Sequence, residues 1–333
     1  MFLENTLREA YSAVNPYCTG PFPFFLLSSP VLPDRTRREI SENSLYGFPK
    51  EAVCVSVVGY GTAGGMMERL MVLGTGNASV TRCYNTCFAL HDGEHAILVD
   101  AGGGNGIIHR LNQMGLDLAS IRHAFVSHQH TDHLLGMIWI IRQIATLMLA
   151  DQYEGYFCIH AGGGLTQTIR TISQLTLAPV MADLVDRRIL LQEVEDGEKR
   201  RLGTYQFTFF DIGSSLTHQF GFTARLHNGR SLVFLGDEPL LNAGRRHAKD
   251  CDWLLSEAYC LYAQRAIFKP HEKFHSTVRE ACEAAAELNV CNLVLWHTED
   301  TQLADRKRLY TEEGRQFFHG NLFVPDDLEE IIL

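Results

Sequence analysis

The stretch that decides the fold is His128-Gln129-His130-Thr131-Asp132-His133, which directly follows the short apolar run 123–127. Imidazole and carboxylate groups are the ligands that hold zinc and similar ions. Alternate residues of an extended loop point the same way, so the first two histidines can chelate one ion. The last two residues reach the start of a long apolar helix expected over 134–150, where they can turn toward a second ion. The stretch therefore predicts a metal site at a strand-to-helix junction.

Three more donors lie at the ends of predicted strands. His218 precedes the strand 220–226, Asp237 follows the strand 231–235, and His297 ends the strand 293–296. Loops at strand ends commonly carry functional groups, because the strands hold them rigidly. A single His or Asp after a strand is most often structural, but together with the first cluster these three predict the remaining ligands.

Composition restricts the class of protein. The chain has 333 residues, 46% of them hydrophobic, and a formal net charge of -10. An acidic chain is not expected to bind nucleic acid in general, although a bound metal pair attracts phosphate locally. The nine cysteines are scattered and odd in number, which favours a reduced, cytoplasmic setting. The N-terminus is a poor signal peptide, and the apolar run 134–150 is short for a membrane span, so no membrane association is expected.

The organisation of the chain divides near residue 67. Half of the ten prolines fall within the first 33 residues, so we treat 1–66 as an N-terminal extension that packs on the main domain or forms a homodimer. Residues 67–333 are the expected catalytic domain. Strands are expected over 52–58, 70–76, 86–90, 96–99, 123–127, 189–194, 205–211, 220–226, 231–235, 253–256 and 293–296, and helices over 107–114, 134–150 and 277–288.

These motifs together resemble the metallo-β-lactamase superfamily. The matching residues are Asp100 in Leu98-Val-Asp-Ala-Gly102, the 128–133 stretch, His218, Asp237 and His297. Within the superfamily, three shorter elements are similar to the ribonuclease Z and phosphodiesterase branch: Leu73-Gly-Thr-Gly-Asn77, Glu257-Ala-Tyr259 and His275-Ser-Thr277. The resemblance covers about residues 69–300.

The resemblance implies an α+β fold, a four-layer αββα sandwich with two divalent metal ions at one edge of its sheets. It also implies ligand roles for the donors named above. His128, His130 and His218 would hold the first ion, Asp132, His133 and His297 the second, and Asp237 would bridge both. Asp100 would support the ligands. Zinc is the expected metal, with manganese or iron as alternatives.

One departure bears on the substrate. In members that process tRNA, a long arm is inserted between the positions of His218 and Asp237. Here that interval is 237 − 218 = 19 residues, which two strands and a tight turn fill. We therefore rank tRNA 3′-processing below the other functions.

The favoured function is hydrolysis of a phosphodiester in a small or nucleotide-like substrate. Two ions about 3.5–4 Å apart can share a hydroxide that attacks phosphorus. His275 is the candidate general acid, because it lies in a loop just before the capping box at Thr277. Glu257 is expected to hydrogen-bond His275 and orient it, and Asp132 completes the catalytic set.

Other functions stay open. The same metal pair can activate water against a carbonyl or sulfate ester, as in a lactonase, thioesterase or arylsulfatase. A diiron redox protein generally needs a carboxylate in place of His130, so the sequence argues against it. A non-catalytic metal-binding scaffold is the remaining alternative, and substrate profiling separates these classes.

Overall fold

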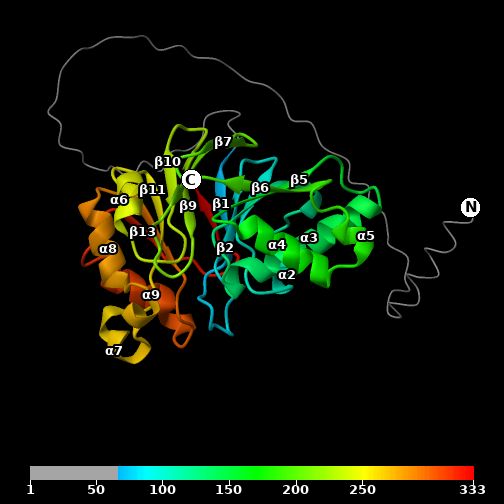
Figure 1. Ribbon diagram of the computed structural model, residues 1–333. Helices are drawn as coiled ribbons and strands as arrows, with labels where there is room; N and C mark the ends of the chain where they lie inside the picture. Colours follow the sequence, from blue (N-terminus) through cyan, green and yellow to red (C-terminus); the bar gives the residue numbers. More distant parts are fainter. Residues whose placement is uncertain (1–66) are drawn as a thin grey trace, which may run out of the picture. The chain divides into compact units, whose positions relative to one another are not determined.

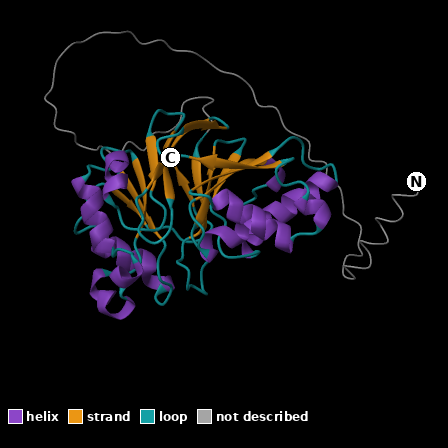
Figure 2. Ribbon diagram, viewed as in Figure 1, coloured by secondary structure: helices purple, strands orange, loops and turns teal. Residues whose placement is uncertain are grey.

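A computed structural model describes residues 67–333, and the predicted extension over 1–66, with its strand at 52–58, lies outside these residues. Two seven-stranded sheets lie face to face, and helices cover the outer face of each (Figure 1 and Figure 2). The layers therefore run helix, sheet, sheet, helix. This arrangement confirms the predicted αββα sandwich.

The first sheet has the strand order β14-β1-β2-β3-β4-β5-β6. Its strands are β1 (Arg69–Gly74), β2 (Cys87–His91), β3 (Ala96–Val99), β4 (Ile121–Val126), β5 (Phe157–Gly162), β6 (Ile189–Val194) and β14 (Glu330–Ile332). The helices of this half are α2 (Gly106–Gln113), α3 (Thr131–Leu149), α4 (Leu165–Thr176) and α5 (Pro179–Ala182), with a 3-10 turn η1 at Leu118–Ser120. Strands β3 to β6 are parallel neighbours.

The second sheet has the order β13-β12-β11-β10-β9-β8-β7. Its strands are β7 (Lys199–Leu202), β8 (Tyr205–Asp211), β9 (Phe220–Arg225), β10 (Ser231–Phe234), β11 (Trp253–Glu257), β12 (Asn292–Trp296) and β13 (Asn321–Phe323). Its helices are α6 (Asn242–Ala248), α7 (Arg265–Phe268), α8 (Val278–Glu287) and α9 (Leu303–Gly314), with 3-10 turns η2 (Tyr262–Gln264) and η3 (Pro270–Lys273). Strands β10 to β13 are parallel.

Aromatic side chains fill the space between the two sheets. Phe88 of β2 stacks on Trp296 of β12 with ring centroids 4.9 Å apart, and it meets Phe234 of β10 edge-on at 5.3 Å. These rings are fully buried or nearly so. Offset stacks and edge contacts stabilise a core beyond the area that they bury. The two sheets are thereby fixed against each other, so donors at their ends hold constant positions.

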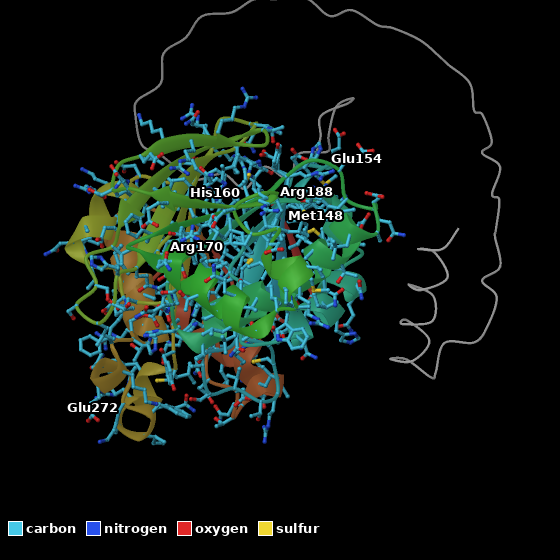
Figure 3. The ribbon with its side chains drawn as sticks, turned by 45° about the vertical axis from the view of Figure 1, so that its right-hand side comes forward. Met148, Glu154, His160, Arg170, Arg188 and Glu272 are labelled. Carbon is cyan, nitrogen blue, oxygen red and sulfur yellow. The ribbon has the colours of Figure 1, made fainter. Side chains whose placement is uncertain are left out.

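Charged contacts fix the loops at the β5–β6 edge of the first sheet. Arg170 of α4 pairs with both carboxylate oxygens of Asp186 at 2.6 and 3.0 Å, while Arg188 donates to the main-chain carbonyls of Tyr153 and Gly155. Figure 3 labels the two arginines. Exposed ion pairs of this kind contribute little to stability. They set loop geometry at an edge of the fold.

The helix α3 is long and apolar enough to cross a membrane by length and composition. Much of its surface, however, is buried in the core that the first sheet shares with its helices, including Met137, Ile141 and Ile144. The helix of a protein core passes the same test. This burial agrees with the expectation of a buried helix over 134–150, although the cell compartment stays a prediction.

A glycine lets α3 approach the loop after β3. Gly136 donates its N–H to the Gly102 carbonyl at 2.7 Å, and a Cβ at Gly136 would lie 1.8 Å from the Ala101 carbonyl oxygen. The first turn of α3 is thereby seated on the loop that begins at Asp100. Any side chain at this position would push the helix away from the loop.

We expect Gly136→Ala to destabilise the protein by about 1–3 kcal/mol, the usual effect of forcing extra volume into a packed site. The sign of this change is informative, because replacing glycine by alanine inside a helix otherwise stabilises a protein by about 1 kcal/mol. Urea unfolding followed by circular dichroism measures the change. Gly104→Ala is the control, since a Cβ there meets nothing within 4 Å. A stabilised Gly136→Ala protein would contradict the close approach.

Candidate metal centre

The predicted cluster lies at the junction of β4 and α3. Strand β4 ends at Val126, and α3 begins at Thr131 with His130 in the extended N-cap conformation. The helix starts three residues earlier than the expected 134. Asp132 and His133 therefore belong to its first turn, where the helix dipole favours a negative side chain.

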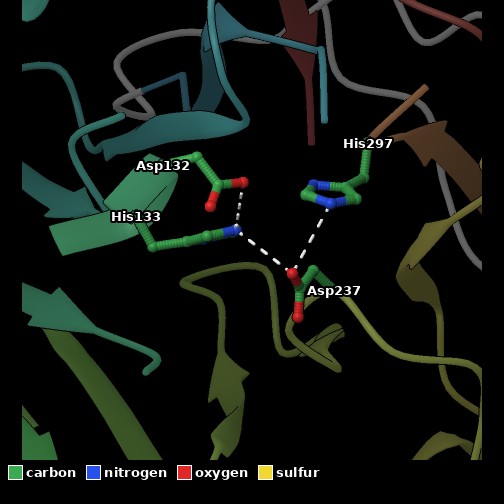
Figure 4. A group of neighbouring side chains, drawn as sticks. All are labelled: Asp132, His133, Asp237 and His297. Atoms are coloured by element: carbon green, nitrogen blue, oxygen red, sulfur yellow. Dashed lines mark ion pairs between the residues drawn. The ribbon is translucent and has the colours of Figure 1, made fainter. Parts of the chain in front are cut away.

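Four buried donors converge on one point. Asp132, His133, Asp237 and His297 offer ligand atoms that all lie within 4.8 Å of one another. The Oδ2 atom of Asp237 is 3.3 Å from Nε2 of His133 and 3.5 Å from Nε2 of His297 (Figure 4). They come from α3, from the loop after β10 and from the end of β12, so both sheets contribute.

A second group shares the carboxylate of Asp237. Nε2 of His128 lies 3.5 Å from the same Oδ2 atom, and 2.8 Å from Nδ1 of His130. His128 is buried, whereas His130 is exposed. Because Asp237 belongs to both groups, it is the one described carboxylate that can contact two ions at once.

The donor atoms suit a divalent cation. Asp132 Oδ2 and His133 Nε2 are buried and have no hydrogen-bond partner among the described residues. The two atoms lie 3.3 Å from each other, and a buried polar atom without a hydrogen bond costs about 1–3 kcal/mol. A cation placed between these atoms would satisfy both. The described residues thus include a His/Asp group that can bind metal.

Asp100 supports the centre from behind. Its Oδ2 accepts hydrogen bonds from Nδ1 of His133 and from the Ser127 hydroxyl, both at 2.8 Å. Its Oδ1 accepts the Ser127 N–H at 2.8 Å. With the His133 proton on Nδ1, the lone pair of Nε2 faces the other donors. Asp100 therefore orients a donor and does not itself face the metal position.

His297 is oriented in the same way. Its Nδ1 lies 3.2 Å from the Thr86 hydroxyl, which itself donates to the Gly76 carbonyl. The imidazole therefore carries its proton on Nδ1 and presents Nε2. Both His297 and Asp100 adopt left-handed backbone angles, with φ of 57° and 53°. Such angles are uncommon in residues other than glycine, although Asp and His adopt them more readily than most, and they persist where the surrounding structure requires them.

The electrostatics of the group favour an added positive charge. Burial lowers the pKa of His128 and of His297 to about 3, so both are neutral donors. Burial alone would also lower the pKa of His133, but the carboxylates of Asp132, Asp100 and Asp237 raise it well above its usual value. A proton on His133 balances these carboxylates, and a metal ion would supply the same positive charge.

The structure does not bring His218 to the centre. Its side chain is 72% exposed, and Nδ1 lies 3.6 Å from the Asp211 carboxylate. The neighbouring Gln219 is buried instead, and its Nε2 donates to Oδ1 of Asp237 at 2.5 Å and lies 3.2 Å from Nδ1 of His128. In this geometry the expected third imidazole of the first ion is absent from the two described donor groups.

His275 lies next to the metal-binding group, in the loop before α8. Its Nδ1 contacts the Asp237 main-chain carbonyl at 2.9 Å, and its ring stacks on Tyr259 with centroids 5.0 Å apart. The expected hydrogen bond to Glu257 is not formed, since Oε2 of Glu257 is 3.7 Å from Nδ1. The Asp237 carbonyl, rather than the Glu257 carboxyl, accepts the hydrogen bond from Nδ1 of His275. Glu257 is fully buried, and burial raises the pKa of its carboxyl well above the usual value.

A cavity of about 240 Å³ opens onto these residues. It is lined by His130, Asp132, Asp237, His275 and His297 together with groups that the sequence did not indicate. Two of those groups are linked, because Nζ of Lys273 donates to the Tyr259 hydroxyl at 3.0 Å. Lys273 lies two residues before His275, and nothing in the sequence distinguishes it from an ordinary surface lysine.

Comparison with known proteins shows which families the chain resembles. A family model described as "Anti-Pycsar protein Apyc1" matches residues 68–148, which is less than half of the chain. The ribonuclease Z of Haloferax volcanii is 25% identical over 80% of this chain and 95% of its own length. The chain is thus similar to that enzyme over nearly the whole of the described part.

Two solved structures share the fold. The metallo-β-lactamase fold protein YhfI of Bacillus subtilis superposes with a TM-score of 0.65 at 15% identity, covering 80% of this chain and 99% of YhfI. Zinc-bound PqqB of Methylobacterium extorquens gives 0.61 at 13% identity, covering 80% of this chain and 100% of PqqB. The chain thus has the metallo-β-lactamase fold, its sequence is similar to that of ribonuclease Z, and its described residues include a His/Asp group that could hold a metal ion.

Proposed function

We propose that this chain hydrolyses phosphodiesters in small or nucleotide-like substrates and that it uses two divalent ions, zinc foremost. The observation that carries the proposal is the cavity where metal-binding side chains, His275 and a lysine meet. His128 and His130 would hold one ion, Asp132, His133 and His297 would hold the other, and Asp237 belongs to both groups of donors. His218 would join the first ion only if its side chain turned in from the solvent.

Bound ions would supply activated water and neutralise charge on the phosphoryl oxygens. The protein's own groups do the rest. Lys273 places one positive charge in the cavity wall, held there by the Tyr259 hydroxyl. A phosphodiester carries one negative charge, whereas a carboxylic ester carries none. Lys273 therefore favours binding of the phosphodiester over the carboxylic ester.

His275 is suited to protonate the leaving oxygen. Its Nδ1 donates to the Asp237 carbonyl, so Nε2 is the nitrogen that can carry the transferred proton, although burial lowers the pKa of the imidazole. The ring lines the cavity and is fixed by its stack on Tyr259. A general acid must lie within hydrogen-bond reach of the oxygen that it protonates, and this placement supports that role.

A second candidate is the tRNA processing that the name of the Haloferax relative implies. The sequence similarity favours it. Against it, the described residues 218–237 form only β9, β10 and the turn between them, with no inserted arm. Carbonyl and sulfate ester hydrolysis stay as the third possibility, because the same donor set serves those reactions.

The test compares substrates on the full chain loaded with zinc or with manganese. We expect turnover of bis(p-nitrophenyl) phosphate that a chelator abolishes, and little turnover of p-nitrophenyl acetate or p-nitrophenyl sulfate. In Lys273→Met, KM for the diester should rise by about tenfold, a loss of about 1.4 kcal/mol, while KM for the neutral acetate should not change.

The outcomes separate the candidates. Faster acetate or sulfate hydrolysis than diester hydrolysis would contradict the phosphodiesterase proposal. Cleavage of a precursor tRNA at its 3′ end with no turnover of small diesters would favour the second candidate. An equal effect of Lys273→Met on charged and neutral substrates would remove the role of Lys273 in recognising charge.

A further inference from the structure

We propose that the two metal positions of this chain are unequal, the one at His128 and His130 binding its ion more weakly, with Gln219 as its positioning residue. The inference rests on the metal roles proposed above. It concerns binding alone, so it is tested without substrate.

The stronger position has buried donors throughout. Asp132, His133, Asp237 and His297 are all buried, and the proton positions of His133 and His297 are set by Asp100 and Thr86. The carboxylate and imidazole atoms already point at one another (Figure 4). A site organised in this way needs little rearrangement to bind an ion.

The weaker position has fewer and looser donors. Besides the shared Asp237, it has two imidazoles, and His130 is exposed. Nε2 of His128 and Nδ1 of His130 are in hydrogen-bond contact at 2.8 Å, and an ion must break that contact to bind both. The third imidazole is absent, because His218 faces the solvent and pairs with Asp211.

Gln219 takes the buried place beside this position. Its Nε2 donates to Oδ1 of Asp237 at 2.5 Å and so holds the carboxylate whose other oxygen, Oδ2, lies near the imidazoles. The same Nε2 lies 3.2 Å from Nδ1 of His128, which is also 3.0 Å from the Ser127 hydroxyl. Oδ2 of Asp237 and Nε2 of His128 then face each other at a distance of 3.5 Å. Groups that hold ligands in this manner typically change metal affinity by 10–100-fold when they are removed.

The experiment is a Co²⁺ titration of the chelator-stripped full chain, followed by visible absorbance and by equilibrium dialysis. We expect two steps whose affinities differ by about tenfold or more. His297→Ala should remove the tight step, and His130→Ala, at an exposed residue, should remove only the weak step. The absorbance bands report the ligand geometry of each step separately.

Two neighbouring residues give a matched pair of variants. Gln219→Met keeps the side-chain volume but removes the donor, and it should weaken the second step by about 10–100-fold. His218→Ala should leave both steps unchanged. Two steps of equal affinity in the unmodified chain, a tenfold weaker second step in His218→Ala, or an unchanged second step in Gln219→Met would each overturn the inference. Absence of phosphodiesterase activity would leave it standing.

Discussion

We expect Asp237→Ala to lower kcat/KM for a phosphodiester by about 10³–10⁴-fold, because bound metal contributes several kcal/mol to transition-state stabilisation. The reason is geometric. Oδ2 of Asp237 lies within 3.5 Å of Nε2 of His128, His133 and His297, so no other described residue reaches both donor groups. Its removal leaves four imidazoles and the Asp132 carboxylate, with no carboxylate shared between the two groups.

The measurement pairs steady-state kinetics with metal content determined by mass spectrometry. Metal content should fall together with activity in Asp237→Ala, and His128→Ala should show the same pattern for one ion. Asp186→Asn is the control, since Asp186 pairs with Arg170 at the surface. Full activity or full metal content in Asp237→Ala would exclude the bridging role.

The second large effect is expected at His275. Removal of a general acid usually slows catalysis by 10²–10⁴-fold, and we expect a fall of about that size in kcat for His275→Ala. Metal content should not change, because His275 contacts the main-chain carbonyl of Asp237 rather than its carboxylate. This combination of slow turnover with retained metal distinguishes an acid from a ligand.

The chain offers a matched control four residues earlier. His271 is exposed and pairs with Glu280 at 2.9 Å, so His271→Ala should have normal turnover. A p-nitrophenyl ester releases p-nitrophenolate, a leaving group that needs no proton. The fall in kcat caused by His275→Ala should therefore be smaller for a p-nitrophenyl ester than for an alkyl ester. Equal defects on both substrates, or no defect at all, would exclude the general-acid role.

Much of the fold followed from local patterns. The capping box at Thr277 forms as expected and begins α8. Strands rich in apolar residues were found at β2, β3 and β12, within a residue of their observed ends. Two of the missed strands had no such pattern: β7 is Lys-Arg-Arg-Leu, and β14 has three residues that pair with β1. Long-range pairing of so short a segment leaves no local trace. The apolar strand β5 (Phe157–Gly162) was missed as well.

Most of the predicted ligand residues lie close together for a similar reason, whereas the structure places His218 outside the group. The 128–133 stretch is compact, so its chemistry is visible in the sequence itself. The choice between His218 and Gln219 is different, because successive residues of an extended chain point to opposite sides. A shift of one residue decides which side chain enters the site. Residue chemistry favours the histidine, and only the register of β9 turns the glutamine inward.

The left-handed backbone at Asp100 and His297 places opposing demands on stability and activity. Glycine or asparagine would relax either position, since both adopt such angles with less strain. Each replacement would also remove a group that the centre uses: the carboxylate behind His133, or the imidazole beside Asp237. A lineage selected only for heat resistance would drift toward those replacements and lose its chemistry. At both positions the backbone conformation and the chemistry of the centre therefore favour different residues.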